Sequence, residues 1–429
     1  MARLLYTLAG YLLLPWALAH LLWRARRQPE YLRHWRERFA YYGGGRAAPS
    51  PLLWIHAVSV GETRAAEPLL ALLQAHYPEH RILLTHTTPT GRTVGETLYG
   101  ERVARAYLPY DTPGATQRFL RHFRPVLGVL METEIWPNLI AACGAREIPL
   151  LLANARLSAR SARRYALLPT LTRAALQGLS GIAAQSEEDA QRLRQLGATS
   201  VVVSGNLKFD STPAPELLAR GRDWRRRWGL TTRPVLLAAS TREGEEQLLL
   251  EALRHQPVAD LLLIIVPRHP QRFAAVAALA TQFGYPVQQR SHIGTDADPD
   301  VAALAPTTQV LLGDSMGELS AYYAASDVAI IGGSLLDYGS QNLIEACAVG
   351  TPVLLGPSTY NFSWAAAAAL ACGAARQEAD AAALLRTAAA LLADPAVRQR
   401  MADAGLQFSA GHRGASQRTL RLLTSLLPR

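Results

Sequence analysis

The feature that most constrains the fold is a repeated alternation of short apolar runs with longer stretches rich in Ala and Leu. Runs of Val, Ile and Leu, such as LLWIHAVSV at 52–60, each precede a turn and a segment with a helical pattern. A strand that is followed by a crossover helix builds a parallel sheet. The order of the segments therefore predicts an α/β protein.

Two such series occur along the chain. The first predicts strands at 52–60, 81–88, 104–110, 125–134, 148–155, 181–186 and 200–206. A polar, broken stretch at 211–234 precedes the second series, which predicts strands at 234–240, 259–269, 306–314, 327–335 and 351–358. We expect an N-terminal anchor at 1–27, a Rossmann-like domain at 28–222 and a second one at 223–429, ending in a helix at 416–427. Two Rossmann-like domains that face a central cleft form the GT-B plan, shared by glycosyltransferases and some sugar epimerases.

The N-terminus carries an uncharged run at 4–23, which is long enough to cross a bilayer core. The positive-inside rule predicts a cytoplasmic body, because one arginine, Arg3, precedes this run and many follow it. We expect the following arginines to lie on anionic headgroups. Pro15 and His20 weaken a spanning helix, so a monotopic insertion and a buried core helix stay open. The arginines that follow the run are Arg24, Arg26, Arg27, Arg33, Arg36 and Arg38.

The charge balance predicts an anionic partner, since the formal net charge is +10 and the pI is about 9.8. No basic stripe interleaved with aromatic residues occurs in the body, so nucleic acid is not the expected partner. Cys143, Cys347 and Cys372 lie far apart in apolar sequence and show no metal-ligand spacing. This usage favours a reducing compartment.

Candidate catalytic residues of the first series follow its strands, where open α/β sheets bind ligands. Glu62 in SVGE is either a helix N-terminal charge or a general base. Glu132 and Glu134 in METEIWPN share a face if the strand continues and diverge if the chain turns at Pro137; a solvated rim is the alternative. Lys208 in GNLKFD is the only lysine of the chain, and its point charge suits a phosphate or a carboxylate. The structural alternative is an ion pair with Asp210 or a nearby glutamate.

The second series predicts a phosphate-binding edge. Ser240 and Thr241 fit a helix N-cap with a phosphate contact. Arg268 and His269 end the next predicted strand. The stretch GDSMGEL at 313–319 offers backbone amides and the carboxylate of Glu318. A helix that opens at 340–342 suits phosphate, and Glu345 within its first turn suits ribose hydroxyls.

In their order, these stretches resemble one family over nearly the whole chain, the anchor included. It is that of the 3-deoxy-D-manno-octulosonic acid (Kdo) transferases, the GT-B enzymes of glycosyltransferase family 30 that add Kdo to lipid A precursors. Each motif is short, but the set in order is specific. The matching stretches are HAVSVGE, TPTGR, YLPYD, METEIWPN, ANARLSARSA, AQSEED, GNLKFD, STREGEE, VPRHP, GDSMGEL, GGSL, QNLIEA and GPSTYNF.

The resemblance implies roles for individual residues. Glu62 would be the general base that deprotonates the acceptor hydroxyl, and Glu132 and Lys208 would stabilise the transition state. The reaction would invert the anomeric centre and need no metal and no cofactor, since cations and helix amides can take up the phosphate charge. The residues that would hold the CMP of the donor CMP-Kdo are Arg268, His269, Met316, Gly317, Glu318, Asn342, Leu343, Ile344 and Glu345.

The resemblance also implies the partners and the location. The acceptor would be the lipid A precursor lipid IVA, at the cytoplasmic face of the bacterial inner membrane, and the arginines at 24–38 and 156–164 fit its phosphates and the membrane surface. One departure is Gln341, which stands where the family commonly has a histidine and cannot carry a proton; Ser340 likewise replaces a glycine. The alternatives are a sugar-nucleotide epimerase of the same fold and a membrane-tethered, non-catalytic nucleotide-binding module.

Overall fold

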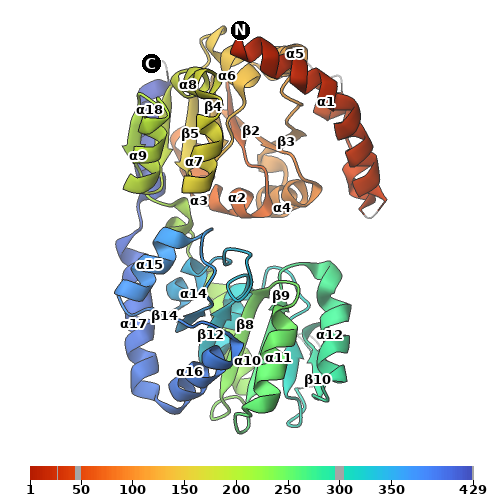
Figure 1. Cartoon of the computed structure of the whole chain (residues 1–429), viewed down its shortest axis with the longest axis vertical. Coiled ribbons are helices and arrows are strands. Elements are labelled where there is room, and N and C mark those ends of the chain that lie inside the picture. The colour runs from red at the N-terminus through yellow and green to blue at the C-terminus, as the bar shows by residue number, and fades with distance from the viewer. Residues whose placement is uncertain (27, 44–49, 295–303, 428–429) are drawn as a thin grey trace. The chain divides into compact units, whose positions relative to one another are not determined.

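The computed structural model describes residues 1–429 except 27, 44–49, 295–303 and 428–429. The chain divides into two compact units (Figure 1). The first comprises Met1–Ser211 together with Arg413–Arg429, and the second comprises Thr212–His412.

The first unit is built on a parallel sheet of seven strands in the order β3-β2-β1-β4-β5-β6-β7. Its strands read as apolar runs because helices cover both faces of the sheet, and all five residues of β1 are buried. The strand order reverses between β1 and β4, where ligands bind in open sheets of this kind. The strands are β1 Leu52–His56, β2 Arg81–His86, β3 Ala104–Tyr107, β4 Leu127–Met131, β5 Leu150–Ala155, β6 Gly181–Ala184 and β7 Val201–Val203.

Alternation along the strands separates two cores in this unit. Trp54 of β1 packs with Phe119 on one face of the sheet, while its neighbours Leu53 and Ile55 pack with Leu423 on the other. Most helices of this unit begin where the sequence supplies a capping serine or a proline at the first position, as Ser59 does for α2. They are α1 Ala2–Ala25, α2 Val60–Ala65, α3 Glu67–His76, α4 Pro89–Tyr99, α5 Pro113–Phe123, α6 Pro137–Gly144, α7 Ala159–Ala166, α8 Pro169–Gln177, α9 Glu187–Gln195 and α18 Ala415–Leu426, with 3₁₀ turns η1 Pro29–Leu32, η2 Trp35–Phe39, η3 Gly100–Arg102 and η4 Leu207–Asp210.

The second unit repeats the plan with a parallel sheet in the order β10-β11-β9-β8-β12-β13-β14, which reverses between β8 and β12. Its strands are β8 Val235–Thr241, β9 Leu262–Pro267, β10 Val287–Gln289, β11 Val310–Leu312, β12 Val328–Ile331, β13 Val353–Leu355 and β14 Ala375–Gln377. Its helices are α10 Pro215–Arg227, α11 Glu245–His255, α12 Phe273–Gln282, α13 Leu319–Ala325, α14 Ile344–Val349, α15 Ser363–Ala371, α16 Ala381–Ala393 and α17 Pro395–Gly411, with 3₁₀ turns η5 Pro270–Arg272 and η6 Arg290–His292.

The α/β class with two Rossmann-like sheets is confirmed, and every predicted strand is present, most of them shortened and β8 shifted by one residue. The short strands β10 and β14 were not predicted, because their sequences VQQ and ARQ carry no apolar run. The break between the units falls at 211/212, whereas the sequence suggested 222/223. The polar stretch after it forms α10, which Arg225 ties to Asp327 of the second unit at 2.9 Å.

The C-terminal helix returns to the first unit, although the sequence suggested one domain from 223 to the end. Leu420 and Leu423 of α18 join the apolar core that contains Leu53 and Ile55. The carboxylate of Asp210 accepts hydrogen bonds from the amides of Gly414 at 2.6 Å and Ser416 at 2.5 Å. These contacts bind the start of α18 next to the turn that carries Lys208.

Candidate active site

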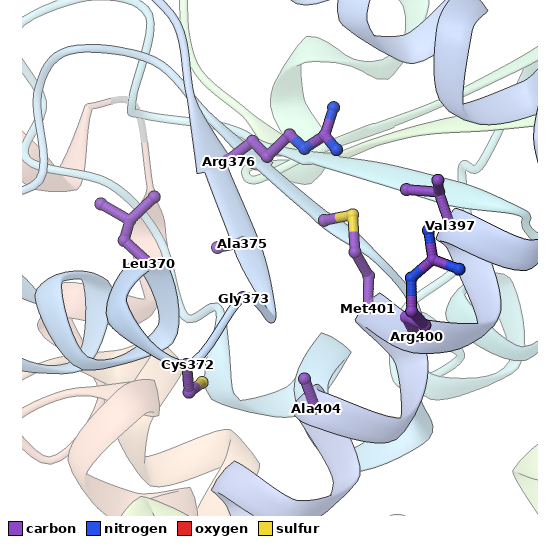
Figure 2. A pocket seen from close by; sticks show the side chains of 9 residues that line it. All are labelled: Leu370, Cys372, Gly373, Ala375, Arg376, Val397, Arg400, Met401 and Ala404. Carbon is purple, nitrogen blue, oxygen red and sulfur yellow. The ribbon is translucent and has the colours of Figure 1, made fainter.

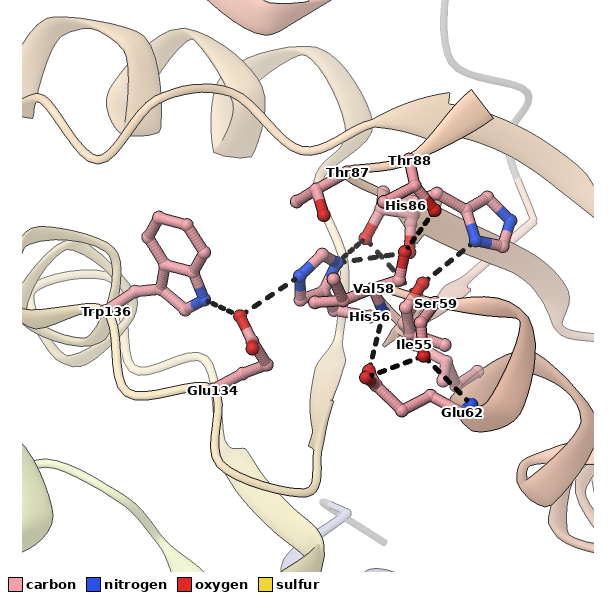
Figure 3. A network of polar contacts seen from close by, with 12 residues as sticks. Ile55, His56, Val58, Ser59, Glu62, His86, Thr87, Thr88, Glu134 and Trp136 are labelled. Atoms are coloured by element: carbon pink, nitrogen blue, oxygen red, sulfur yellow. Dashed lines mark hydrogen bonds and ion pairs between the residues drawn. The ribbon is translucent and has the colours of Figure 1, made fainter. Parts of the chain in front are cut away.

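Glu62 lies at the switch point of the first sheet, in the first turn of α2 (Figure 3). Its Oε2 accepts a hydrogen bond from the Val58 amide at 2.6 Å, and its Oε1 accepts one from the Ser59 hydroxyl at 3.0 Å. Ser59 in turn caps the amide of Glu62. The carboxylate thus has the N-terminal helix role that the sequence allowed, with a fixed orientation.

The same carboxylate is electrostatically unusual. Burial raises the pKa of Glu62 to about 8, and Glu132 and Glu134 add to the rise when they are ionised, while the hydrogen bonds from Val58 and Ser59 oppose it. A base works best when its pKa lies near the working pH. Glu62 therefore combines fixed geometry with a proton affinity suited to proton transfer.

Glu132 and Lys208 contact each other. Lys208 Nζ donates to Glu132 Oε1 at 2.9 Å, and both side chains are less than one-fifth exposed. Burial alone would raise the pKa of Glu132, but the charge and hydrogen bond of Lys208, with the charge of Arg156, hold it below its ordinary value. Lys208 thus forms an ion pair with a nearby glutamate, as the structural alternative for this residue predicted. The pair joins two of the predicted catalytic residues.

The turn after β4 separates the two glutamates of METEIWPN. Glu132 has a left-handed backbone with φ of 57°, and Glu134 turns away to accept a hydrogen bond from the Trp136 indole at 2.8 Å. Pro137 then begins α6. Of the two alternatives for this motif, divergence at the turn is the one that occurs.

Two residues hold the Lys208 turn in place through contacts that the sequence did not predict. Asn154, at the end of β5, accepts the Leu207 amide at 3.0 Å through its side-chain oxygen, and Asp210 binds α18. Asn154 also has a left-handed φ of 54° and is fully buried. An asparagine at a strand end was the one available signal, because Asn tolerates this conformation better than most residues.

The N-terminal arginines do not all behave as expected. Arg24, Arg26, Arg33 and Arg36 are exposed, and Arg27 lies outside the described residues. The expectation of a headgroup contact is wrong for Arg38, which is 6% exposed. Its guanidinium donates to the Thr87 carbonyl at 3.0 Å and lies over the Tyr107 ring. Tertiary packing thus turns one surface-type residue into a core residue.

In the second unit the expected donor-binding residues follow the carboxyl ends of the strands. Arg268 and His269 follow β9, residues 316–318 lie between β11 and α13, and residues 342–345 enter α14. Glu345 accepts a hydrogen bond from the Ser320 hydroxyl at 2.8 Å, which joins α14 to the start of α13, directly after residues 316–318. Leu343 and Ile344 have buried side chains, so their backbones are what they can offer a ligand.

A cluster of cations surrounds His269. Partial desolvation lowers the pKa of His269, and the nearby charges of Arg242, Arg268 and Arg272 lower it further. Arg272 is bound by the buried Glu246 through two hydrogen bonds of 2.7 and 2.8 Å, whereas the His269 side chain is exposed. The positive potential of this edge suits an anionic ligand.

The expected N-cap at Ser240 and Thr241 is wrong. Helix α11 begins at Glu245 with Gly244 at its N-cap, and the Thr241 hydroxyl donates to Glu246 instead. The buried Glu245 accepts the amides of Gly333 at 2.6 Å and Leu335 at 2.9 Å. Glu245 therefore holds the GGSL loop at the switch point, a role that the local sequence pattern does not predict.

The expected helix opening at 340–342 is also displaced. Gly339 and Ser340 have φ of 78° and 68°, so the loop continues and α14 begins at Ile344. The Asn342 side chain accepts the Ile344 amide at 3.1 Å. Gln341, the departure from the family pattern, donates its backbone N–H to Gly332 at 2.9 Å, which fixes the loop independently of its side chain.

Two hollows of about 470 Å³ each lie in the second unit. One, shown in Figure 2, is lined by Cys372, Arg376 and Arg400 and opens at the amino end of β14, so it lies at the sheet edge opposite the candidate donor residues. The other is lined by residues 335–337 and 357–360, which follow β12 and β13 at the same edge as the candidate donor residues. The second hollow is thus the one placed to extend the donor-binding edge.

The class that these observations define is a protein of two α/β units, each built on a seven-stranded parallel sheet, with a GT-B-like fold. A crystal structure of a glycosyltransferase from Rickettsia africae superimposes with a TM-score of 0.60 at 14% identity, over 89% of this chain and 100% of that one. Residues 33–211 match the family described as 3-deoxy-D-manno-octulosonic-acid transferase (kdotransferase).

Two curated relatives identify the family. The 3-deoxy-D-manno-octulosonic acid transferase of Bordetella pertussis is 46% identical over 100% of both chains, and that of Haemophilus influenzae is 39% identical over 94% of this chain and 93% of its own. The chain belongs to the Kdo transferase family and is a glycosyltransferase.

Glu62→Gln is expected to stabilise the protein at alkaline pH. The folded carboxyl, with a pKa of about 8, keeps a proton that the unfolded chain releases near its ordinary value of 4.5, so stability is lost as pH rises from 4.5 through 8. Glutamine removes this loss while it can still accept the Val58 amide. Urea unfolding should show equal stability at pH 4.5 and a more stable variant at pH 8; a less stable variant at pH 8 would contradict the raised pKa.

Proposed function

We propose that the protein transfers Kdo from CMP-Kdo to the lipid A precursor lipid IVA, with inversion and with Glu62 as the general base. The observation that carries the proposal is the contrast at one sheet edge between a carboxyl that favours its neutral form, Glu62, and one that Lys208 keeps ionised, Glu132. Pairs of titratable groups with opposed environments mark acid–base assignments. Family membership supplies the reaction class.

In the proposed reaction the ionised Glu62 carboxylate accepts the proton of the acceptor hydroxyl. The hydroxyl oxygen of the acceptor forms a bond to the anomeric carbon of Kdo in the same step. The bond from this carbon to the CMP phosphate breaks, and its electron pair leaves with CMP. Positive charge that develops at the anomeric centre is stabilised by the Glu132 carboxylate. Lys208 keeps that carboxylate ionised and offsets its charge before and after transfer.

The second unit would bind the donor. Arg268 and His269 supply positive charge for the CMP phosphate, and Glu345 suits the ribose hydroxyls. The remaining contacts would come from residues 316–318 and 342–344, and the hollow at 335–337 and 357–360 has room for the Kdo group. Because protein cations take up the phosphate charge, the proposal includes no metal and no further cofactor.

Mass spectrometry of the products tests the function directly. Wild-type protein incubated with CMP-Kdo and tetraacylated lipid A precursor should add the mass of Kdo, and the increment counts the sugars. Glu62→Gln should lower the transfer rate by at least 10²-fold, the scale of lost general base catalysis, and leave CMP affinity unchanged in calorimetry. Wild-type protein without any adduct would refute the function; an active Glu62→Gln variant would refute only the base.

Lys208→Arg is expected to impair transfer far more than folding. Arginine keeps the charge, but its planar fork cannot take the single 2.9 Å approach of Nζ to Glu132 without moving the partner. We expect at least a tenfold loss in kcat with little change in the urea midpoint. Arg194→Lys, at an exposed pair with Glu187, is the matched control and should leave kcat unchanged. Near wild-type turnover of Lys208→Arg would refute the proposal that catalysis requires a lysine at this position.

We further propose a location at the cytoplasmic face of the bacterial inner membrane, with α1 lying along the membrane surface. Helix α1 is the one described helix long and apolar enough to cross a membrane. Yet Tyr6 donates to Asp111 and Thr7 to Asn138, each at 3.0 Å, near the start of the helix. Its end packs through Leu21 and Ala25 on Tyr31. A spanning helix would carry one of these ends across the bilayer, about 30 Å from the body.

Chemical crosslinking in native membranes tests this orientation. In a variant with Cys143, Cys347 and Cys372 replaced by alanine, the pair Thr7→Cys and Asn138→Cys should be joined by a short bis-thiol reagent. The control pair, Leu13→Cys and Asn138→Cys, uses an exposed residue of the same helix and should remain unlinked. Crosslinking of detergent-solubilised protein without crosslinking in membranes would indicate a spanning helix instead.

A further inference from the structure

His56 is a buried histidine with an unusual environment beside the candidate base. It is the last residue of β1, its side chain is 0% exposed, and its Nε2 has no hydrogen-bond partner. Glu134 Oε2 lies 3.8 Å from that nitrogen, too far for a hydrogen bond but directly opposite it (Figure 3). The two residues face each other across the switch point between β1 and β4.

The opposite nitrogen of the ring determines where its proton lies. His56 Nδ1 is 3.1 Å from the Thr85 carbonyl and 3.0 Å from the Thr85 hydroxyl. A carbonyl only accepts, so Nδ1 carries a proton that it donates to Thr85. The hydroxyl is already an acceptor for the Trp54 indole at 2.8 Å, which fits an acceptor role toward Nδ1 as well. In the neutral ring, Nε2 would then present a lone pair to Glu134.

A buried lone pair that faces a carboxylate oxygen at 3.8 Å is unfavourable, because both groups are hydrogen-bond acceptors. One proton between Nε2 and Glu134 removes the repulsion and satisfies the orphaned nitrogen. Glu134 is oriented for this contact by the Trp136 indole, which donates to the same oxygen at 2.8 Å. Its side chain is 21% exposed, so the proton can exchange with solvent.

We propose that His56 and Glu134 share one proton, and that this neutral pair keeps Glu62 able to ionise in the pH range where the acceptor hydroxyl is activated. The inference rests on Glu62 as the proposed base. In this arrangement His56 is a positioning residue: it touches no substrate and acts by cancelling the charge of Glu134. The role explains why a histidine is buried at the end of β1.

The charges around the site make Glu134 the decisive neighbour. The groups whose charges act on Glu62 are Glu132 and Glu134. Lys208 and Arg156 offset Glu132. His86, the other histidine at this edge, donates to the Ala57 carbonyl at 2.9 Å, and burial lowers its pKa to about 3, so it stays neutral. Glu134 is thus the carboxylate whose charge depends on His56.

The pH dependence of kcat/KM in four proteins tests the pair. If the pair is neutral, His56→Gln leaves a charged Glu134 and moves the acid limb to higher pH by roughly one unit, the effect of one charge at an effective dielectric constant of about 20. Glu134→Gln leaves a neutral site and keeps the limb in place, and the double variant returns it to the wild-type position. The readout is the position of the limb, not its height.

An unshared proton predicts the reverse pattern. Glu134 would then be charged in the wild type, so Glu134→Gln would move the acid limb of the profile to lower pH, and His56→Gln would leave it in place. This result overturns the proposal, and so does the absence of a shift in every variant. Glu187→Gln, which removes an exposed carboxylate on α9, is the control and should show no shift. Turnover by Glu62→Gln would instead refute the proposed base, independently of the pair.

Histidine NMR keeps the proposal testable if His56→Gln fails to fold. In full-length protein with ¹⁵N-labelled histidine in detergent micelles, His56 should show protons on both ring nitrogens at pH 7. In Glu134→Gln, the Nε2 nitrogen should lose its proton and shift to the unprotonated range. A ring that is singly protonated in the wild type, or unchanged in Glu134→Gln, overturns the shared proton.

Discussion

The ion pair between Lys208 and Glu132 is the interaction on which the first unit's site depends. It places the chain's only lysine 2.9 Å from Glu132, which has a left-handed backbone, at the point where the sheet order reverses. Without Lys208, a carboxylate less than one-fifth exposed would be driven toward its neutral form. Glu62 and Glu132 would then both favour the neutral form, and the contrast between them would disappear.

Hydrogen bonds from neighbouring segments position both partners of this ion pair. At the end of β5, the Ala153 carbonyl accepts the Glu132 amide at 2.9 Å, and the next residue, Asn154, accepts the Leu207 amide at 3.0 Å. One strand end therefore holds both partners. On the other side Asp210 attaches the lysine turn to α18, 204 residues further along the chain. This explains why the C-terminal helix belongs with the first unit.

The sequence predicted what depends on local pattern. Periodic apolar runs placed the strands, and because parallel strands end at a common edge, the residues after them, such as Glu62, Glu132 and Lys208, could be expected together. Contacts between distant segments could not be read in this way. Asp210 with Gly414, Tyr6 with Asp111, and Arg38 in the core are all set by tertiary packing, which overrides the exposure that composition suggests. The left-handed backbone of Ser340 likewise continues the loop, so that α14 begins at Ile344 and not at the predicted 340–342.

The site also shows how identical side chains acquire different chemistry from their positions. Glu62, Glu132 and Glu134 lie at one sheet edge, and each receives different partners: two hydrogen bonds from α2, a lysine, and an indole beside a buried histidine. Three ionised carboxylates there would repel one another. A cation can neutralise one, and a proton must be retained near the others. If the retained proton lies between His56 and Glu134, Glu62 is the carboxylate left to exchange its own with the acceptor, so the burial of His56 becomes a condition for base catalysis.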